Sequence, residues 1–158
     1  MKTLLIFTGK TADKDIAKLT DRYLERIGHY IQISVGVVPD LKNTAKLSEA
    51  QVNEAEGAGI LKLLKPDDYV VLLDERGKEY RSVELAAHLN KLFTSQGNRR
   101  LVFVIGGPYG FSPQVQAVAT GRLSLSKMTF SHQMVRLIFA EQLYRAMTIL
   151  HNEPYHHE

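Results

Sequence analysis

Five consecutive apolar residues, LVFVI at Leu101–Ile105, constrain the fold more than any other part of this chain. A strand with one solvent-exposed face alternates polar and apolar residues, whereas a strand that is covered by protein on both faces is apolar throughout. The run therefore predicts an inner strand of a largely parallel α/β sheet. Gly106, Gly107 and Gly110 follow at once, and without side chains they let a ligand approach the backbone at the carboxyl end of the strand.

The rest of the sequence alternates strand and helix patterns, as such a sheet requires. Further strands are expected at 2–8, 30–38, 69–73 and 123–125, and helices at 12–29, 49–64, 83–94 and 132–150, with a short helix after Ser112. The charged residues 74–77 read as a turn. The last helix is apolar around most of its circumference, which predicts deep burial or packing on a partner subunit. Serines precede four of the helices as expected N-caps, at Ser48, Ser82, Ser112 and Ser131.

Length and composition favour a single soluble domain spanning residues 1–158, with 44% hydrophobic and 23% charged residues. No apolar run approaches the roughly 20 residues that cross a bilayer, and no export signal is apparent, so a cytoplasmic protein without membrane contact is expected. The absence of cysteine excludes disulfides and thiolate chemistry. A net charge of +3 is compatible with an anionic partner but does not by itself imply nucleic acid.

Two candidate sites have plain structural explanations beside the functional ones. The glycine turn is not G-x-G-x-x-G, so it fits a dinucleotide fingerprint poorly, and a structural turn is as good an explanation as a ligand loop. Asp74 and Glu75 could form a catalytic pair, yet adjacent residues on a turn point apart, and solvated acids are the favoured interpretation. Residues 125–130 are favoured as an ordinary connecting loop, although their free backbone groups could bind a small molecule.

The C-terminal part of the chain offers further candidates. Arg136 lies four residues after His132 on one helix face and is a candidate for binding phosphate. Glu141 and Arg145 have the spacing of a helical ion pair. The tail at 154–158 places Tyr155 beside two histidines, a poor metal site because consecutive side chains diverge. A flexible end and an aromatic contact to an unpaired base both remain open for it.

Several separated motifs resemble one family in the right order along the whole chain. VIGGPYGFS, LSLSKMTFSHQMVR, EQLYRA and PYHHE, with LLDERGK before them, are similar to the ribosomal RNA large subunit methyltransferase H family of the SPOUT class. The resemblance implies an α/β fold with a C-terminal trefoil knot, a homodimer, and S-adenosyl-L-methionine as methyl donor. It further implies methylation at N3 of a pseudouridine in 23S rRNA, recognised on the assembled ribosome.

The resemblance also implies roles for individual residues. Tyr155 and His156 would lie near the target base, with a tail able to reach the partner subunit's pocket, and His157 would contact RNA where family members often carry Arg or Lys. Arg136 is expected to hold RNA phosphate. The mechanism is expected to be a direct displacement without a metal, with His156 or Tyr155 assisting loss of the imide proton. Cofactor binding is expected at Leu73, Gly106, Gly107, Leu125, Ser126, Lys127, Met128, Thr129 and Phe130.

Three other functions stay open from the sequence. A non-catalytic ribosome-binding protein could use the same scaffold without a methyl donor, and a related methyltransferase could act on another RNA such as transfer RNA. A flavodoxin-like or dinucleotide-binding oxidoreductase would need a phosphate-binding loop after the first strand. This chain has only the short sequence TGKT at 8–11 there, which disfavours that class.

Overall fold

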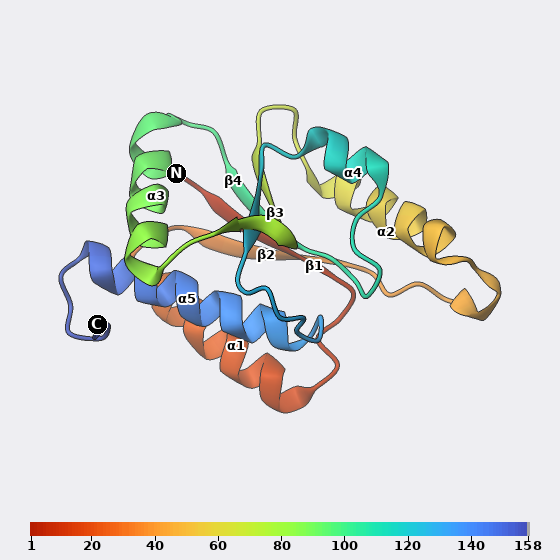
Figure 1. Ribbon diagram of the computed structural model, residues 1–158, viewed down its shortest axis with the longest axis horizontal. Helices are drawn as coiled ribbons and strands as arrows, with labels where there is room; N and C mark the ends of the chain where they lie inside the picture. Colours follow the sequence, from red (N-terminus) through yellow and green to blue (C-terminus); the bar gives the residue numbers. More distant parts are fainter. Residues whose placement is uncertain (158) are drawn as a thin grey trace.

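The computed structural model describes residues 1–157, so Glu158, the end of the PYHHE motif, lies outside the described residues. It contains one sheet of five parallel strands in the order β2-β1-β4-β3-β5. The central strand β4 is the apolar run, and its side chains are at most 3% exposed. The predicted parallel α/β architecture is therefore confirmed (Figure 1). The strands are β1 (Thr3–Thr8), β2 (Ile33–Val38), β3 (Tyr69–Glu79), β4 (Leu101–Ile105) and β5 (Gly121–Ser124).

Helices cover both faces of the sheet, which explains why β4 has no polar residue (Figure 1). Alternate β4 residues Leu101, Phe103 and Ile105 pack into one core with residues of α1, α3 and α5, and Val102 and Val104 pack into the other with α2 and α4. The helices are α1 (Lys14–Ile27), α2 (Glu49–Leu63), α3 (Ser82–Ser95), α4 (Pro113–Val118) and α5 (Met134–Leu150), with a short 3-10 helix, η1, at Thr44–Lys46.

Two helices begin at the serine caps that the sequence predicts. The Ser48 hydroxyl accepts from Gln51 N–H in a capping box, and Ser112 accepts from Val115 N–H. Ser131 accepts from Met134 N–H, but α5 begins two residues later than expected, with Gln133 as its N-cap. Ser82 is an exception, because it is the first residue of α3 and its hydroxyl donates to Gln142 Oε1 of α5 at 2.9 Å. A tertiary contact thus replaces the predicted local cap.

The predicted charged turn after Leu73 is wrong. β3 continues to Glu79, and its pairing with β5 breaks after Leu73 and resumes at Lys78, opposite Leu123. Gly77 allows this, because a Cβ there would lie 2.7 Å from the Arg122 carbonyl carbon. β5 is accordingly Gly121–Ser124, two residues earlier than expected. Polar residues in an irregular strand look like a turn until the neighbouring strand is known.

Helix α5 is buried along one face against α1 and α3. Met134 is 40% exposed, so the deep burial expected for an apolar helix is seen on one side only, and packing on a partner subunit stays a prediction. No helix within residues 1–157 has the length and hydropathy needed to span a bilayer.

Candidate functional site

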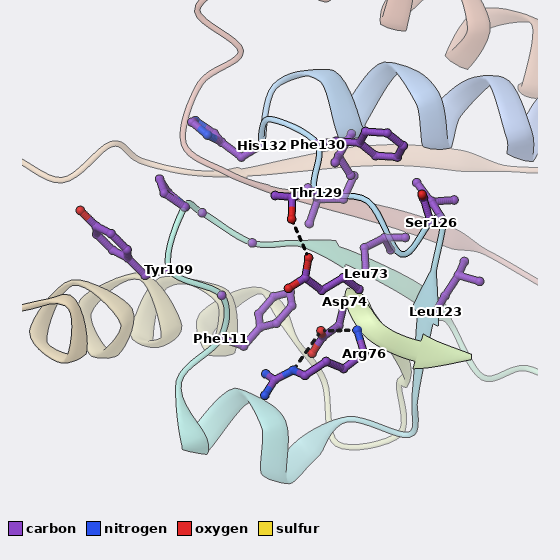
Figure 2. A pocket seen from close by; sticks show the side chains of 18 of the residues that line it. Leu73, Asp74, Arg76, Tyr109, Phe111, Leu123, Ser126, Thr129, Phe130 and His132 are labelled. Carbon is purple, nitrogen blue, oxygen red and sulfur yellow. Dashed lines mark hydrogen bonds and ion pairs between the residues drawn. The ribbon is translucent and has the colours of Figure 1, made fainter. Parts of the chain in front are cut away.

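A cavity of about 550 Å³ opens at the carboxyl ends of β4 and β5, beside the middle of β3 at residues 73–76 and the first turn of α5 (Figure 2). This is where the glycine turn led us to expect a ligand. Lys127 lies outside the cavity wall on the exposed surface of its loop. The other residues expected to bind the cofactor all line the cavity, namely Leu73, Gly106, Gly107, Leu125, Ser126, Met128, Thr129 and Phe130.

The glycines of the turn make room for neighbouring side chains. A Cβ on Gly106 would lie 3.0 Å from the Phe111 ring, and a Cβ on Gly107 would lie 2.6 Å from Glu56 Oε2. Gly110 has φ +80°, a left-handed conformation that favours glycine. The turn therefore brings bare backbone to the cavity wall.

The opposite wall is the loop from β5 to α5, which is held by its own hydroxyl groups. Ser124 Oγ donates to the Ser126 carbonyl, and Ser126 Oγ accepts from Met128 N–H, both at 2.9 Å. Thr129 Oγ1 donates to Glu75 Oε2 at 3.0 Å across the cavity mouth (Figure 2). Met128 is 75% exposed. The loop thus has a fixed backbone and an exposed apolar tip.

The carboxylates of Asp74 and Glu75 have different partners. Asp74 accepts from Arg76 N–H and forms ion pairs with Arg76 at 3.5 Å and Arg122 at 3.9 Å, whereas Glu75 accepts from Thr129 (Figure 2). This favours the interpretation as separate acids over a catalytic pair. No cluster of three or more potential metal ligands lies within residues 1–157.

A second cavity of about 310 Å³ adjoins the first at the carboxyl ends of β1 and β2. It shares Glu49, Pro108, Tyr109 and His132 with the larger cavity. Asp40 and Glu56 add two further carboxylates to its wall. Sequence reasoning missed these residues, because they come from a loop and a helix with no recognisable motif.

Arg136 is not available to RNA, so its predicted phosphate contact is contradicted. Its side chain is 0% exposed and donates to the carbonyls of Thr8, Gly9 and His132 and to Thr11 Oγ1. Burial lowers the pKa of Arg136, an effect that the negative charge of Asp40 opposes. Arg136 instead ties α5 to the end of β1, and thereby fixes the loop beside the second cavity.

The tail packs on the C-terminal half of α5. Tyr155 hydroxyl donates to Glu141 Oε1 at 3.0 Å, and its ring meets the edge of Tyr144 at 4.8 Å between centroids. Burial, with hydrogen bonds to Tyr23 and Glu141, raises the pKa of Tyr155 well above its ordinary range. The phenol is therefore protonated at neutral pH and serves as a hydrogen-bond donor.

Arg145 contacts both Glu141 on its own helix and His156 in the tail. It pairs with Glu141 at 2.6 Å, as the spacing predicted, and its Nη1 also lies 3.1 Å from His156 Nδ1. A guanidinium only donates, so Nδ1 accepts and the proton of the neutral imidazole sits on Nε2. His156 Nε2 has no hydrogen-bond partner within residues 1–157. His157 is exposed.

The described tail residues line neither cavity of their own subunit. The cavities lie at the first turn of α5, while Arg145 is 11 residues further, roughly 16 Å along the helix. Figure 1 shows the tail at the end of α5 that lies away from its first turn. The two parts of the expected site are thus separated within one chain.

Comparison with known proteins agrees with this architecture. The family model described as "Predicted SPOUT methyltransferase" matches residues 1–156. A protein of Porphyromonas gingivalis named ribosomal RNA large subunit methyltransferase H is 56% identical over 158 residues, and one of the same name from Flavobacterium johnsoniae is 52% identical, each match covering 100% of both chains. A solved structure of a probable methylase family protein from Haemophilus influenzae has a TM-score of 0.53 at 16% identity, covering 99% of this chain and 70% of that one, and supports the fold alone.

Proposed function

Because the chain belongs to the SPOUT methyltransferase family, we propose that it methylates 23S rRNA at N3 of a pseudouridine in the assembled ribosome, using S-adenosyl-L-methionine. Its full-length relatives bear the name ribosomal RNA large subunit methyltransferase H, which supports a ribosomal RNA substrate. The observation that carries the proposal is the large cavity, since the loops named by the resemblance converge on it from three different strands.

The cavity wall fits this cofactor in shape and charge. Leu73, Leu125 and Phe130 give apolar surface for a nucleobase, and the bare backbone of the glycine turn gives hydrogen-bonding groups at close range. Asp74 is paired with Arg76 and Arg122, but Glu75 accepts only from the neutral Thr129 hydroxyl among the described contacts. Its charge is complementary to a cationic sulfonium and unfavourable to a pyrophosphate. The acidic wall therefore favours S-adenosyl-L-methionine over the dinucleotide of the alternative oxidoreductase.

S-adenosyl-L-methionine, when bound, supplies an electrophilic methyl group, so the protein has chiefly to align the base with it. Tyr155 and His156 would contact that base from a partner subunit, since they lie far from the cavity of their own chain. In the observed arrangement the Tyr155 hydroxyl already donates to Glu141, whereas the Nε2–H of His156 has no partner within residues 1–157 and suits a carbonyl oxygen of the base. His157 is exposed and could contact RNA.

The homodimer and the trefoil knot are part of the same proposal. A partner subunit is needed to complete the site, and Met134 at 40% and Leu19 at 38% exposure leave apolar surface on α5 and α1 for it. Cytoplasmic location follows from a ribosomal substrate.

The decisive experiment is methyl transfer to ribosomes that lack the modification, mapped to single nucleotides. We expect incorporation at one pseudouridine of 23S rRNA and little in naked rRNA or transfer RNA. Transfer to transfer RNA would support a related methyltransferase instead. A protein that binds ribosomes but shows no calorimetric signal with S-adenosyl-L-methionine would be non-catalytic.

A further inference from the structure

The second cavity lies where a methyl acceptor has to be. Direct displacement requires the reacting atoms to be within about 3–3.5 Å of each other, so the acceptor must occupy space that adjoins the cofactor. The second cavity shares four wall residues with the first, among them Tyr109 and His132. The volume of about 310 Å³ is ample for one nucleobase. A base seated there would face the larger cavity directly.

The negative charge of this cavity favours binding of a nucleobase over binding of a phosphate. Its described lining residues include the carboxylates of Asp40, Glu49 and Glu56 and no lysine or arginine. Carboxylates repel the phosphodiester backbone and accept hydrogen bonds from N–H groups. A flipped nucleobase with ring N–H groups therefore fits the chemistry of the wall.

Glu56 is the carboxylate with an unused acceptor in a sheltered position. It projects from α2 beneath the glycine turn, next to the place that a side chain on Gly107 would fill. Within residues 1–157 its Oε1 has no hydrogen-bond partner, and an unpaired buried acceptor is unfavourable. Burial, with the nearby charge of Asp40, raises the pKa of Glu56. Oε1 is shielded from solvent in this arrangement, so a ligand N–H would reach the carboxylate from its cavity side, where Glu56 lines the wall, and would relieve both penalties.

The tail of the same subunit cannot supply this acceptor, because its described residues line neither cavity. The Nδ1 lone pair of His156 is also taken by Arg145 at 3.1 Å. The N–H groups of the base consequently need an acceptor from the cavity itself.

We propose that the second cavity binds the target base and that Glu56 accepts a hydrogen bond from N1–H of pseudouridine, an inference that rests on the proposed function. Pseudouridine is joined to its ribose through carbon, so N1 keeps a hydrogen, whereas N1 of uridine carries the ribose. N1 and N3 flank one carbonyl of the ring, so a base with N3 toward the cofactor turns N1–H to a different wall. Glu56 is then a specificity-determining residue.

The test compares Glu56→Met, which removes the acceptor, with Glu56→Gln, which keeps an amide oxygen. Initial rates are measured on ribosomes carrying either pseudouridine or uridine at the target. We expect Glu56→Met to reduce the preference for pseudouridine about tenfold, the factor that one hydrogen bond to a buried carboxylate supports, and Glu56→Gln to retain more of it. Glu54→Met on the exposed face of α2 is the matched control and should leave the preference intact.

Binding measurements separate this inference from the proposed function. Short RNAs containing pseudouridine or uridine are titrated into the cofactor-free protein by NMR, and Glu56→Met should lose the preference seen with the unchanged chain. Affinity for S-adenosyl-L-methionine, measured by calorimetry, should stay the same in the Glu56 variants. Weaker cofactor affinity in them, or an unchanged preference for pseudouridine, would overturn the assignment. A chain that binds pseudouridine through Glu56 yet never methylates ribosomes would overturn only the proposed function.

Discussion

Arg136 shows how a single side chain can be misjudged from its type. An arginine near the start of a helix in an RNA-binding protein suggests a phosphate contact, but here the guanidinium lies against the Phe7 ring, 4.9 Å from its centroid, and bonds the end of β1. Three backbone carbonyls depend on it for their hydrogen bonds. Its role in the molecule is to stabilise the fold beside the second cavity.

Replacing Arg136 with Met should therefore lower stability. The carbonyls of Thr8 and Gly9 would lose their donor, and unsatisfied buried carbonyls of this kind cost about 3 kcal/mol in total. The free energy of unfolding is measured by urea denaturation, with exposed Arg22→Met as the control, which should change it by less than about 0.5 kcal/mol. A fully stable Arg136→Met protein with weak RNA binding would restore the phosphate role.

At the scale of elements, one ion pair between the partly exposed Arg100 and the buried Asp68 joins α2, β3 and β4 at the amino ends of the strands. Arg100 Nε and Nη2 donate to the two carboxylate oxygens of Asp68 at 2.9 and 2.6 Å, and Nη2 also donates to the Leu63 carbonyl. Burial alone would raise the pKa of Asp68, but the hydrogen bonds from Arg100 and from Lys65 N–H outweigh it and lower the pKa. The pair holds adjacent strands in register.

Asp68→Asn should lower the free energy of unfolding by about 2–3 kcal/mol at pH 7, since it leaves Arg100 without its charged partner. A lowered folded-state pKa gives stability that is present above the unfolded pKa of about 4 and is lost as pH falls through the folded value. The difference between the two proteins should therefore shrink in strong acid. Asp67→Asn, an exposed neighbour, is the control, and a pH-independent difference would contradict this account.

On the scale of the whole molecule, the cavities and the tail lie at opposite ends of α5. Glu141 and Arg145 fasten Tyr155 and His156 to the helix that carries them, so helix and tail would approach a partner subunit as one unit. On the proposed function, a working site would take its cavity from one subunit and its tail from the other.

Mixed dimers test this arrangement. Thr129→Trp should fill the cavity from its exposed loop, and His156→Ala should remove a tail contact, so each protein alone should methylate ribosomes at a small fraction of the normal rate. Co-expression gives mixed dimers in which one site has both an intact cavity and an intact tail, and activity should return there. Folded mixed dimers that remain inactive would show that the tail acts in its own subunit.

The residues that were predicted well are those whose role is local. The serine caps of α2 and α4 bond groups within their own first turns, and the apolar run of β4 records burial on both faces. The extension of β3 and the cap of α3 were missed, because Gly77 meets β5 and Ser82 bonds α5, both distant in sequence. Glu56 carried no signal at all, since a glutamate on a helix is ordinary until its neighbours are known.

By itself the sequence determined the parallel α/β sheet, the glycine turn and its place at the end of β4, because these follow from local hydrophobic pattern and backbone freedom. Only the tertiary structure decided which charged groups are buried. In the folded chain Arg136 is buried beneath the site and Glu56 lies next to Gly107. The tail packs on α5, away from the cavity of its own chain. Burial and charge pairing depend on residues distant in sequence, such as Arg136 and Thr8 at 128 positions and Gly107 and Glu56 at 51, and no local pattern encodes them.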